Sequence, residues 1–265
     1  MPPEPREIRL HDTRFIGRRV HVYDSLPSTN DMAADFAINR ANDGLAIVAE
    51  HQQSGRGQYG RVWTSRPGSS LLLSVLLFPP EAVRRPVILT ALAAVAVAEA
   101  IRTLTGLQAR IKWPNDLLLH GKKVCGILIE QGLGTVAGIG LNLNQTAEDF
   151  DQDRLPDATS LALETGKPFD LPMAANAILR CLDDEYDRLL GGEIVPLEAD
   201  WKWRIGLLGR QVVAETHDGN TTAGRLREMS FEGVEIEHFE AGMTVLRPEF
   251  VRQLRPAALS APDRC

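Results

Sequence analysis

The chain has 265 residues, 44% of them hydrophobic, with 22 glycines and 16 prolines, so it can bury one substantial core and a small second domain. Lysine and arginine total 29 against 35 aspartates and glutamates, and the net charge of −6 argues against nucleic-acid binding driven by bulk charge. Three distant cysteines, Cys125, Cys181 and Cys265, support neither a disulfide framework nor a zinc site.

The N-terminus, beginning Met-Pro-Pro-Glu-Pro, has no basic segment followed by an apolar run. The most apolar run, residues 87–98, is broken by Glu99 and Arg102, so we expect a buried helix there. These features predict a cytoplasmic protein that does not contact a membrane.

Residues 18–23 alternate polar and apolar side chains and predict a short strand. A helix should follow, because Ser28 and Asp31 have the spacing of a capping box before an apolar stripe. Ser28, Thr29 and Asn30 therefore have two interpretations. They either cap this helix or bind a neutral polar ligand such as a ureido or amide group.

Residues 45–50 predict a strand that ends in a basic, glycine-rich loop, residues 50–66. Three glycines give this loop backbone freedom and three arginines give it anion-binding forks, namely Gly55, Gly57, Gly60, Arg56, Arg61 and Arg66. Trp63 adds a flat face for stacking. Taken alone, the loop is either a solvated turn or a clamp for a compact anion.

The remaining pattern predicts a mixed sheet backed by helices. Strands are expected at residues 71–78, 109–113, 117–119, 123–130 and 135–142, and helices at 85–104, 171–190 and 197–205. The acidic segment 144–170 is expected to be a solvated connector. Short alternating strands at 211–215, 222–226, 233–237 and 243–246 predict a small β-barrel of the SH3 kind. We therefore expect an α+β chain with a catalytic domain at 1–207 and an SH3-like domain at 208–265.

Five sequence elements occur in a specific order: Ser28-Thr29-Asn30, GRGQYGRVW at 55–63, KWPND at 112–116, GKKVCGILIE at 121–130 and GIGLN at 138–142. Together they resemble the biotin protein ligases, and the resemblance runs from about residue 28 to 256. It implies a two-step reaction. Biotin and ATP form biotinyl-5′-AMP and pyrophosphate, and the adenylate then acylates a lysine of a biotin carboxyl carrier domain of a biotin-dependent carboxylase.

The resemblance also implies roles for single residues. Catalytic roles fall on Lys123, Arg56, Arg61 and Asp116, with Lys123 between the biotin carboxylate and the α-phosphate. Biotin would contact Ser28, Thr29, Asn30, Gln53, Arg56, Gly57, Gln58, Lys123 and Gly126. ATP would contact Arg61, Trp63, Lys112, Asn115, Asp116 and Asn142, with Mg²⁺ on its phosphates and no protein metal site. Asp116 either orients the acceptor amine or caps a turn, and Trp113 is expected in the core.

The adenylate is a mixed anhydride that water destroys, so the enzyme must cover it. We expect residues 55–66 to be mobile without ligand and ordered over the adenylate.

Two departures from the family pattern matter. Only 27 residues precede Ser28, too few for the winged-helix domain of the repressor members, so DNA binding and repression are not expected. Gln58 stands where the typical bacterial form has arginine, which predicts weaker adenylate retention or compensation by Arg61 and Arg66.

Two alternatives stay open, a lipoate- or octanoyl-protein ligase and a catalytically silent biotin-binding or scaffold protein. An arginine-bearing GRG loop argues against the first, and the intact Lys123 and Arg56 argue against the second. A homodimer is possible, and a sheet edge near residues 136–143 is expected to pair with either a second copy or the carrier.

Overall fold

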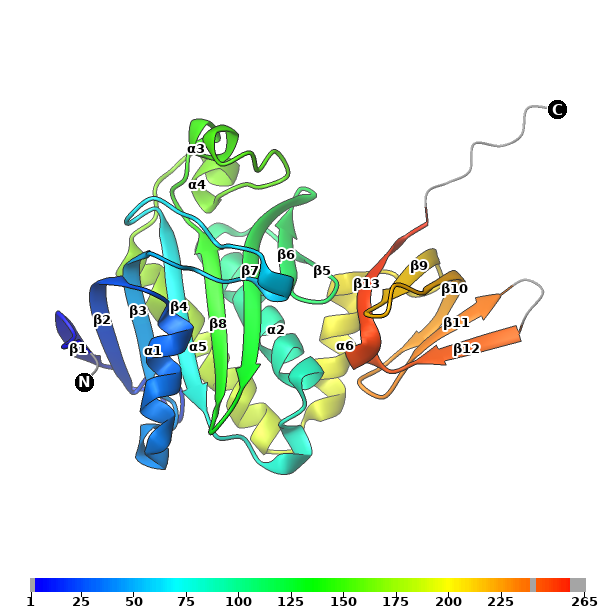
Figure 1. Ribbon diagram of the computed structural model, residues 1–265, viewed down its shortest axis with the longest axis horizontal. Helices are drawn as coiled ribbons and strands as arrows, with labels where there is room; N and C mark the ends of the chain where they lie inside the picture. The colour runs from blue at the N-terminus through cyan, green and yellow to red at the C-terminus, as the bar shows by residue number, and fades with distance from the viewer. Residues whose placement is uncertain (1–2, 239–241, 258–265) are drawn as a thin grey trace.

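The computed structural model of the protein describes residues 3–238 and 242–257. Two β-sheets lie at opposite ends of the molecule, and long helices cover the back of the larger sheet (Figure 1). This arrangement is the expected mixed sheet backed by helices, followed by a small antiparallel β-domain of the SH3 kind. The fold class predicted from the sequence is confirmed.

The larger sheet has eight strands in the order β1-β2-β3-β4-β8-β7-β6-β5. Its members are β1 (Glu7–Leu10), β2 (Arg19–Leu26), β3 (Ala46–Gln52), β4 (Ser70–Leu77), β5 (Arg110–Lys112), β6 (Asp116–Leu119), β7 (Lys122–Gln131) and β8 (Thr135–Asn142). Only β2 and β3 pair in parallel within this sheet, because helix α1 (Thr29–Asp35) carries the chain across between them.

One strand of this sheet was not predicted, and one expected edge is wrong. Strand β1, Glu7–Leu10, does alternate charged and apolar side chains, but four residues after a proline-bearing lead are too short a signal to separate from a loop. The expected edge at residues 136–143 does not exist, since β8 pairs with β4 on one side and β7 on the other over its whole length. The edge strands are β1 and β5.

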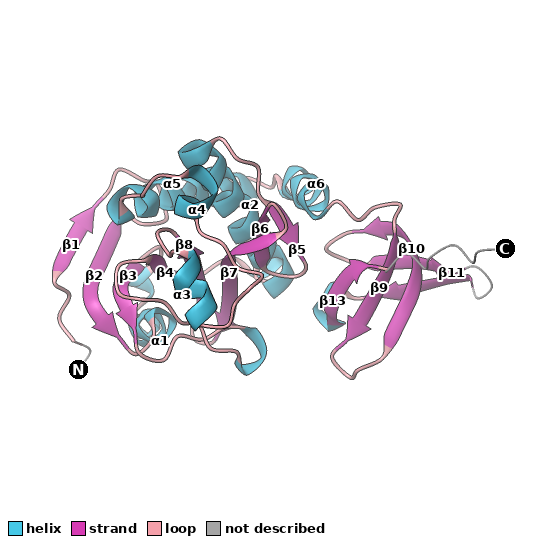
Figure 2. Cartoon of the chain, turned by 90° about the horizontal axis from the view of Figure 1, so that it is seen from above, coloured by secondary structure: helices cyan, strands magenta, loops and turns pink. Residues whose placement is uncertain are grey.

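The helices divide between the two faces of this sheet (Figure 2). Helix α1 lies alone on one face, against β3, β4 and β8. Helices α2 (Pro86–Thr105) and α5 (Leu171–Leu190) cover the other face, and α6 (Ile194–Ile205) follows toward the second sheet. The candidate site lies on the face that carries α1.

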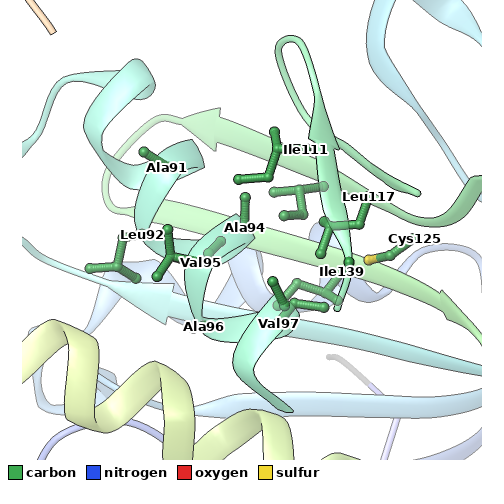
Figure 3. Packing of buried hydrophobic residues seen from close by; sticks show 14 of the residues in the cluster. Ala91, Leu92, Ala94, Val95, Ala96, Val97, Ile111, Leu117, Cys125 and Ile139 are labelled. Carbon is green, nitrogen blue, oxygen red and sulfur yellow. The ribbon is translucent and has the colours of Figure 1, made fainter. Parts of the chain in front are cut away.

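Helix α2 is the buried helix expected from its apolar sequence. Its alanines and valines pack against Ile111, Leu117 and Ile139 of the sheet, because small side chains allow helix and sheet to approach closely (Figure 3). Within the described residues, α2 is the helix whose length and apolar composition would allow it to cross a membrane. However, 72% of that apolar window is buried inside the protein, as in a core helix.

The acidic segment 144–170 is more ordered than expected. It contains α3 (Ala147–Gln152) and α4 (Leu161–Thr165), so the prediction of a plain connector is wrong. Thr146 and Asp149 form a capping box at α3, and Asp149 also pairs with Arg66 at 2.6 Å. The other carboxylates predicted to be solvated, at residues 151, 153 and 157, are exposed.

The second sheet has five antiparallel strands in the order β12-β11-β10-β9-β13. They are β9 (Gln211–Thr216), β10 (Thr221–Met229), β11 (Val234–His238), β12 (Gly242–Leu246) and β13 (Val251–Pro256), and the last of these was not predicted. The division at residues 207 and 208 stays a prediction.

Side chains from the larger sheet and from its helices attach the second sheet to it. Trp113 donates its indole N–H to the Val251 carbonyl at 2.8 Å. Trp201 of α6 packs between Trp113 and Phe231, with ring centroids 5.5 and 5.2 Å away. Arg85, which precedes α2, pairs with Glu232 and Glu249, each at 2.6 Å. Trp113 is therefore a core residue, as expected, and its neighbours come from both sheets.

Candidate active site

A dense group of neutral polar side chains lies where α1 begins. Ser28 caps the helix by accepting from the Asp31 amide, and Thr29 and Asn30 occupy its first turn, 4% and 6% exposed. The Ser74 hydroxyl on β4 lies 2.8 Å from Thr29 Oγ1 and 2.6 Å from Asn30 Oδ1. The Thr29 amide and hydroxyl also donate to Gln52 Oε1, at 2.7 and 2.8 Å. We call these five residues the neutral pocket: Ser28, Thr29, Asn30, Gln52 and Ser74.

The neutral pocket is connected to a charged cluster through Glu130 at the end of β7. Asn30 donates to Glu130 at 2.7 Å, and Arg56 contacts the same carboxylate at 3.1 Å. Arg56 also makes a bidentate pair with Asp31, both distances being 2.7 Å. The hydrogen bonds that Arg56 donates to the Asp31 carboxylate raise the pKa of its guanidinium above its usual range. Arg56 is thus already held by two carboxylates.

The glycine-rich loop folds as a tight hairpin, which we call the glycine-arginine hairpin, residues 55–63. Gly57 donates its amide to the Arg61 carbonyl at 2.8 Å, and the Trp63 amide donates to Gly55 at 2.9 Å. At its tip Tyr59 has a left-handed backbone, φ 60° and ψ 37°, which is uncommon for a residue with a side chain. The expectation that this segment is mobile without ligand stays a prediction.

Trp63 turns inward from the base of this hairpin and lies against the sheet. A methyl group added at Gly140 would come within 2.6 Å of its indole, and one added at Gly126 within 3.0 Å. These glycines on β8 and β7 therefore make room for the ring. The indole N–H is buried and has no hydrogen-bond partner within the described residues.

Lys123 and Asp116 meet beside this tryptophan. The Lys123 ammonium lies 2.7 Å from Asp116 Oδ1 and 5.7 Å from the centroid of the Trp63 ring. It also borders Gly126, where an added methyl group would lie 3.2 Å from the ammonium nitrogen. Strand β7 carries Lys123 and Gly126, and Asp116 begins the neighbouring β6, so adjacent strands fix this group.

Two amides expected at the nucleotide hold the surrounding backbone. Asn115 is buried and donates to the Ile127 carbonyl at 2.5 Å. Asn142, at the end of β8, donates to the Thr159 carbonyl at 3.0 Å and accepts from Gln145 at 2.9 Å. Both lie at the same end of the sheet as Lys123, but their side-chain donors are already used within the protein.

The structure does not bring every predicted residue into this group. Gly57 and Gln58 line a cleft of about 530 Å³ between the hairpin and the second sheet, and Arg56 and Glu130 line it too. Lys112 is exposed on β5, and Arg66 pairs with α3. The exposed Arg61 side chain makes no hydrogen bond or ion pair within the part of the chain that is described.

Gln53 also lies outside the neutral pocket. Its side chain is exposed and contacts Ser25 at 3.3 Å, while Gln52 occupies the place expected for it. Two adjacent glutamines at the end of a strand give no sequence signal that tells which one points inward. Ser74 did give a signal, because a single serine inside an otherwise apolar buried strand must find a hydrogen-bond partner. No sequence signal indicated that Asp31 and Glu130 hold Arg56.

The chain is similar in sequence and in structure to known proteins. Residues 22–144 match the model of the biotin/lipoate A/B protein ligase family. The bifunctional ligase/repressor BirA of Bacillus spizizenii is 33% identical over 237 residues, which cover 87% of this chain and 73% of that protein. The biotin–[acetyl-CoA-carboxylase] ligase of Mycobacterium tuberculosis is 33% identical, with 82% of each chain covered. A biotin protein ligase from Aquifex aeolicus, solved with biotin and ATP, superposes with a TM-score of 0.76 at 26% identity, covering 90% of this chain and 99% of that one.

Proposed function

This chain belongs to the biotin protein ligase family, and we propose that it attaches biotin to a specific lysine of a biotin carboxyl carrier domain in two ATP-dependent steps. The observation that carries the proposal is the position of Lys123. Its ammonium lies beside Gly126 and Trp63 and pairs with Asp116. A cation there neutralises both a carboxylate and a phosphate brought together for reaction.

In the first step a biotin carboxylate oxygen bonds to the α-phosphorus of ATP, and the bond from that phosphorus to the bridging oxygen breaks to release pyrophosphate. The carboxylate is already ionised, so this step needs no general base. Lys123 stabilises the charge on both reactants, and Arg56 and Arg61 add charge from the glycine-arginine hairpin. Arg56 must then exchange Asp31 or Glu130 for the ligand.

The neutral pocket suits the uncharged polar ring of biotin. It offers hydroxyl and amide groups of Ser28, Thr29 and Asn30, nine-tenths or more buried, in a hollow that Arg56 and Trp63 also line. We propose Gln52, rather than Gln53, as the glutamine of this group, because it contacts Thr29. Gly126 has no side chain, so it leaves room beside Trp63 and Lys123.

Trp63 and the end of the sheet suit the nucleotide. The indole offers a face for stacking and a buried N–H donor without a partner in the described residues. Asn115 and Asn142 fix the backbone around the base, and Asp116 borders Lys123. Lys112 stays a proposal for a peripheral phosphate contact.

Magnesium would travel with the ATP phosphates. The described residues contain no group of three or more His, Cys, Asp or Glu side chains placed to hold a metal ion, and Asp116 is engaged by Lys123. The ion would supply further neutralisation of phosphate charge.

In the second step the acceptor lysine amine attacks the acyl carbon of the adenylate, an amide bond forms, and AMP leaves. Asp116 is the carboxylate closest to Lys123, and we propose that it orients the incoming amine. We further propose that the ligase acts without a repressor function and in the cytoplasm. Any homodimer that pairs sheets would use the edge strand β1 or β5, because β8 is interior. The net charge of −6 and the buried, free Cys125 support the first two statements.

Pyrophosphate release from ATP tests the ligase function and separates it from both alternatives. Purified enzyme with biotin, Mg²⁺ and ATP should release pyrophosphate and then transfer biotin to a carrier domain. Release with lipoate in place of biotin would select a lipoate ligase, and no release with either acid would indicate a silent binding protein. A gel-shift assay with promoter DNA tests the absence of repression, and a DNA complex that biotinyl-AMP promotes would contradict it.

A further inference from the structure

The tip of the glycine-arginine hairpin contacts the second sheet. The Tyr59 ring lies 5.4 Å from the His217 ring, centroid to centroid, with the planes inclined by 57°. The Arg252 guanidinium lies 5.5 Å from the same Tyr59 centroid. Tyr59 is therefore in contact with an aromatic ring and a cation that both belong to the second sheet.

This contact compensates an unfavourable backbone. Tyr59 has φ 60°, a conformation that L residues other than glycine seldom adopt, and the neighbouring Gly60 at φ 74° carries no such penalty. A residue persists in this conformation only where its surroundings hold it. The Tyr59 side chain is half exposed, so little burial stabilises it. Its contacts with His217 and Arg252 therefore offset the cost of the left-handed backbone.

The two partner residues are themselves fixed. Arg252 pairs with Glu215 at 3.2 Å, and the His217 amide donates to the Phe250 carbonyl at 3.1 Å. The residue between Phe250 and Arg252 is Val251, whose carbonyl accepts the indole N–H of Trp113. Trp113 lies in the same KWPND turn as Asn115 and Asp116 of the candidate active site. The second sheet thus presents His217 and Arg252 from a position set by the active-site turn.

Hydrogen bonds within the hairpin link Tyr59 at its tip to Arg56 and Trp63 at its base. Arg56 and Val62 form a bridge across it, and the amides of Gly57 and Trp63 close it. Arg56 and Trp63 therefore sit on one short, hydrogen-bonded unit with Tyr59. Displacing the tip displaces the cation and the indole that cover the site.

We propose that Tyr59, His217 and Arg252 form a latch that holds the glycine-arginine hairpin closed over the adenylate, with all three acting as positioning residues. This inference rests on the ligase function proposed above and deepens it. The second sheet then contributes to adenylate retention without contacting the adenylate.

The test measures how fast labelled biotinyl-AMP, formed on the full-length enzyme without carrier, leaves it. Loss of the ring in Tyr59→Ala should speed release about tenfold, and Tyr59→Phe should release at the wild-type rate because the ring contacts remain. Arg252→Ala should speed release by a smaller factor. The double variant should release little faster than Tyr59→Ala alone, because both substitutions remove the same contact between Arg252 and the Tyr59 ring.

Two comparisons separate the latch from other causes. Tyr59→Gly relieves the left-handed backbone, so release as fast as in Tyr59→Ala supports a role for the ring, and wild-type release would overturn the latch. Arg227→Ala removes an arginine that pairs with Glu237 elsewhere on the same sheet, and it should leave release unchanged. Thermal unfolding of each variant shows that it is folded.

The latch is contradicted if Tyr59→Ala releases adenylate at the wild-type rate, or if the effects of Tyr59→Ala and Arg252→Ala simply multiply. A wild-type enzyme that releases no pyrophosphate from biotin and ATP contradicts the ligase function itself, and the latch with it. The two failures are therefore distinct.

Discussion

The neutral pocket and the glycine-arginine hairpin are built in opposite ways. Ser28, Thr29 and Asn30 are buried, uncharged and placed at the start of a helix. Hydrogen bonds of 2.6 to 2.8 Å join Thr29 and Asn30 to Gln52 and Ser74 of the neighbouring strands. The hairpin is exposed and charged, and its Arg56, 41% exposed, is held by carboxylates that a ligand can replace. Recognition of the neutral part of the substrate is therefore built into the core, while contacts with its charged part form by exchange.

Lys123 belongs to neither region, and removing its charge should have the largest effect. Lys123→Met keeps most of the side-chain volume but removes the cation between carboxylate and phosphate. We expect the rate of pyrophosphate release to fall by about 10²- to 10³-fold, with biotin binding affected much less. Lys123→Arg should retain part of the rate. Equal rates for Lys123→Met and the wild type would assign the chemistry to the hairpin arginines instead.

Ser74→Ala tests whether the neutral pocket works as one pre-formed unit. Its hydroxyl contacts both Thr29 and Asn30, so its loss leaves buried polar atoms without partners, a cost of about 1–3 kcal/mol. We expect the Kd for biotin, measured by calorimetry, to rise about tenfold and the Kd for ATP to stay the same. The control is Ser69→Ala, which removes a hydroxyl that donates to Arg66 near the surface. A similar loss for both nucleotide and biotin would show that the pocket is not separate from the hairpin.

Asp31→Asn tests the exchange at Arg56. Exposed ion pairs contribute about 0.2–1 kcal/mol, so releasing Arg56 from this carboxylate should tighten adenylate binding by about two- to fivefold. Asp35→Asn, on the same helix and exposed, is the matched control. Weaker adenylate binding by Asp31→Asn would mean that Asp31 orients Arg56 for the ligand rather than competing with it.

Gln58→Arg adds a cation to the hairpin where the typical bacterial sequence has one. Gln58 Oε1 is buried without a hydrogen-bond partner in the described residues, so this glutamine contributes little in place of an arginine. We expect the variant to label off-target lysines about two- to threefold less than the wild type does, because retention improves. Equal labelling would show that Arg61 and Arg66 already compensate.

The smallest effect at neutral pH concerns His21, which lies on the same sheet face beneath α1, against Phe36. Burial lowers the pKa of His21, so the folded protein favours the neutral ring. The unfolded chain binds a proton near pH 6.5, and stability present above that pH is lost as the pH falls below it. Urea unfolding between pH 7.5 and about 5 should show this loss, and His21→Leu should reduce it.

The sequence predicted most of the fold because its strands and helices carry strong apolar patterns, as in β4 and α2. It missed β1, whose alternation spans only four residues, β13, whose polar pairs break the alternation, and the short helices α3 and α4 within an acidic segment. For the site, the motifs identified Thr29, Asn30, Lys123 and Asp116, which the structure places in one region. It assigned Gln53 where the structure places Gln52 beside Thr29, and it did not show that Asp31 holds Arg56, because both depend on contacts between distant segments.

Trp113 has a consequence for protein engineering. Its indole is hydrogen-bonded to one sheet, stacks on the helix that leads to it, and belongs to the turn that builds the active site of the other. A chimera that joins this catalytic sheet to the C-terminal sheet of a relative would therefore need the donor's counterparts of Trp201, Phe231 and Val251. The two sheets are separate in topology, but one can be replaced only if the contacts of Trp113 with Trp201 and Val251 are kept.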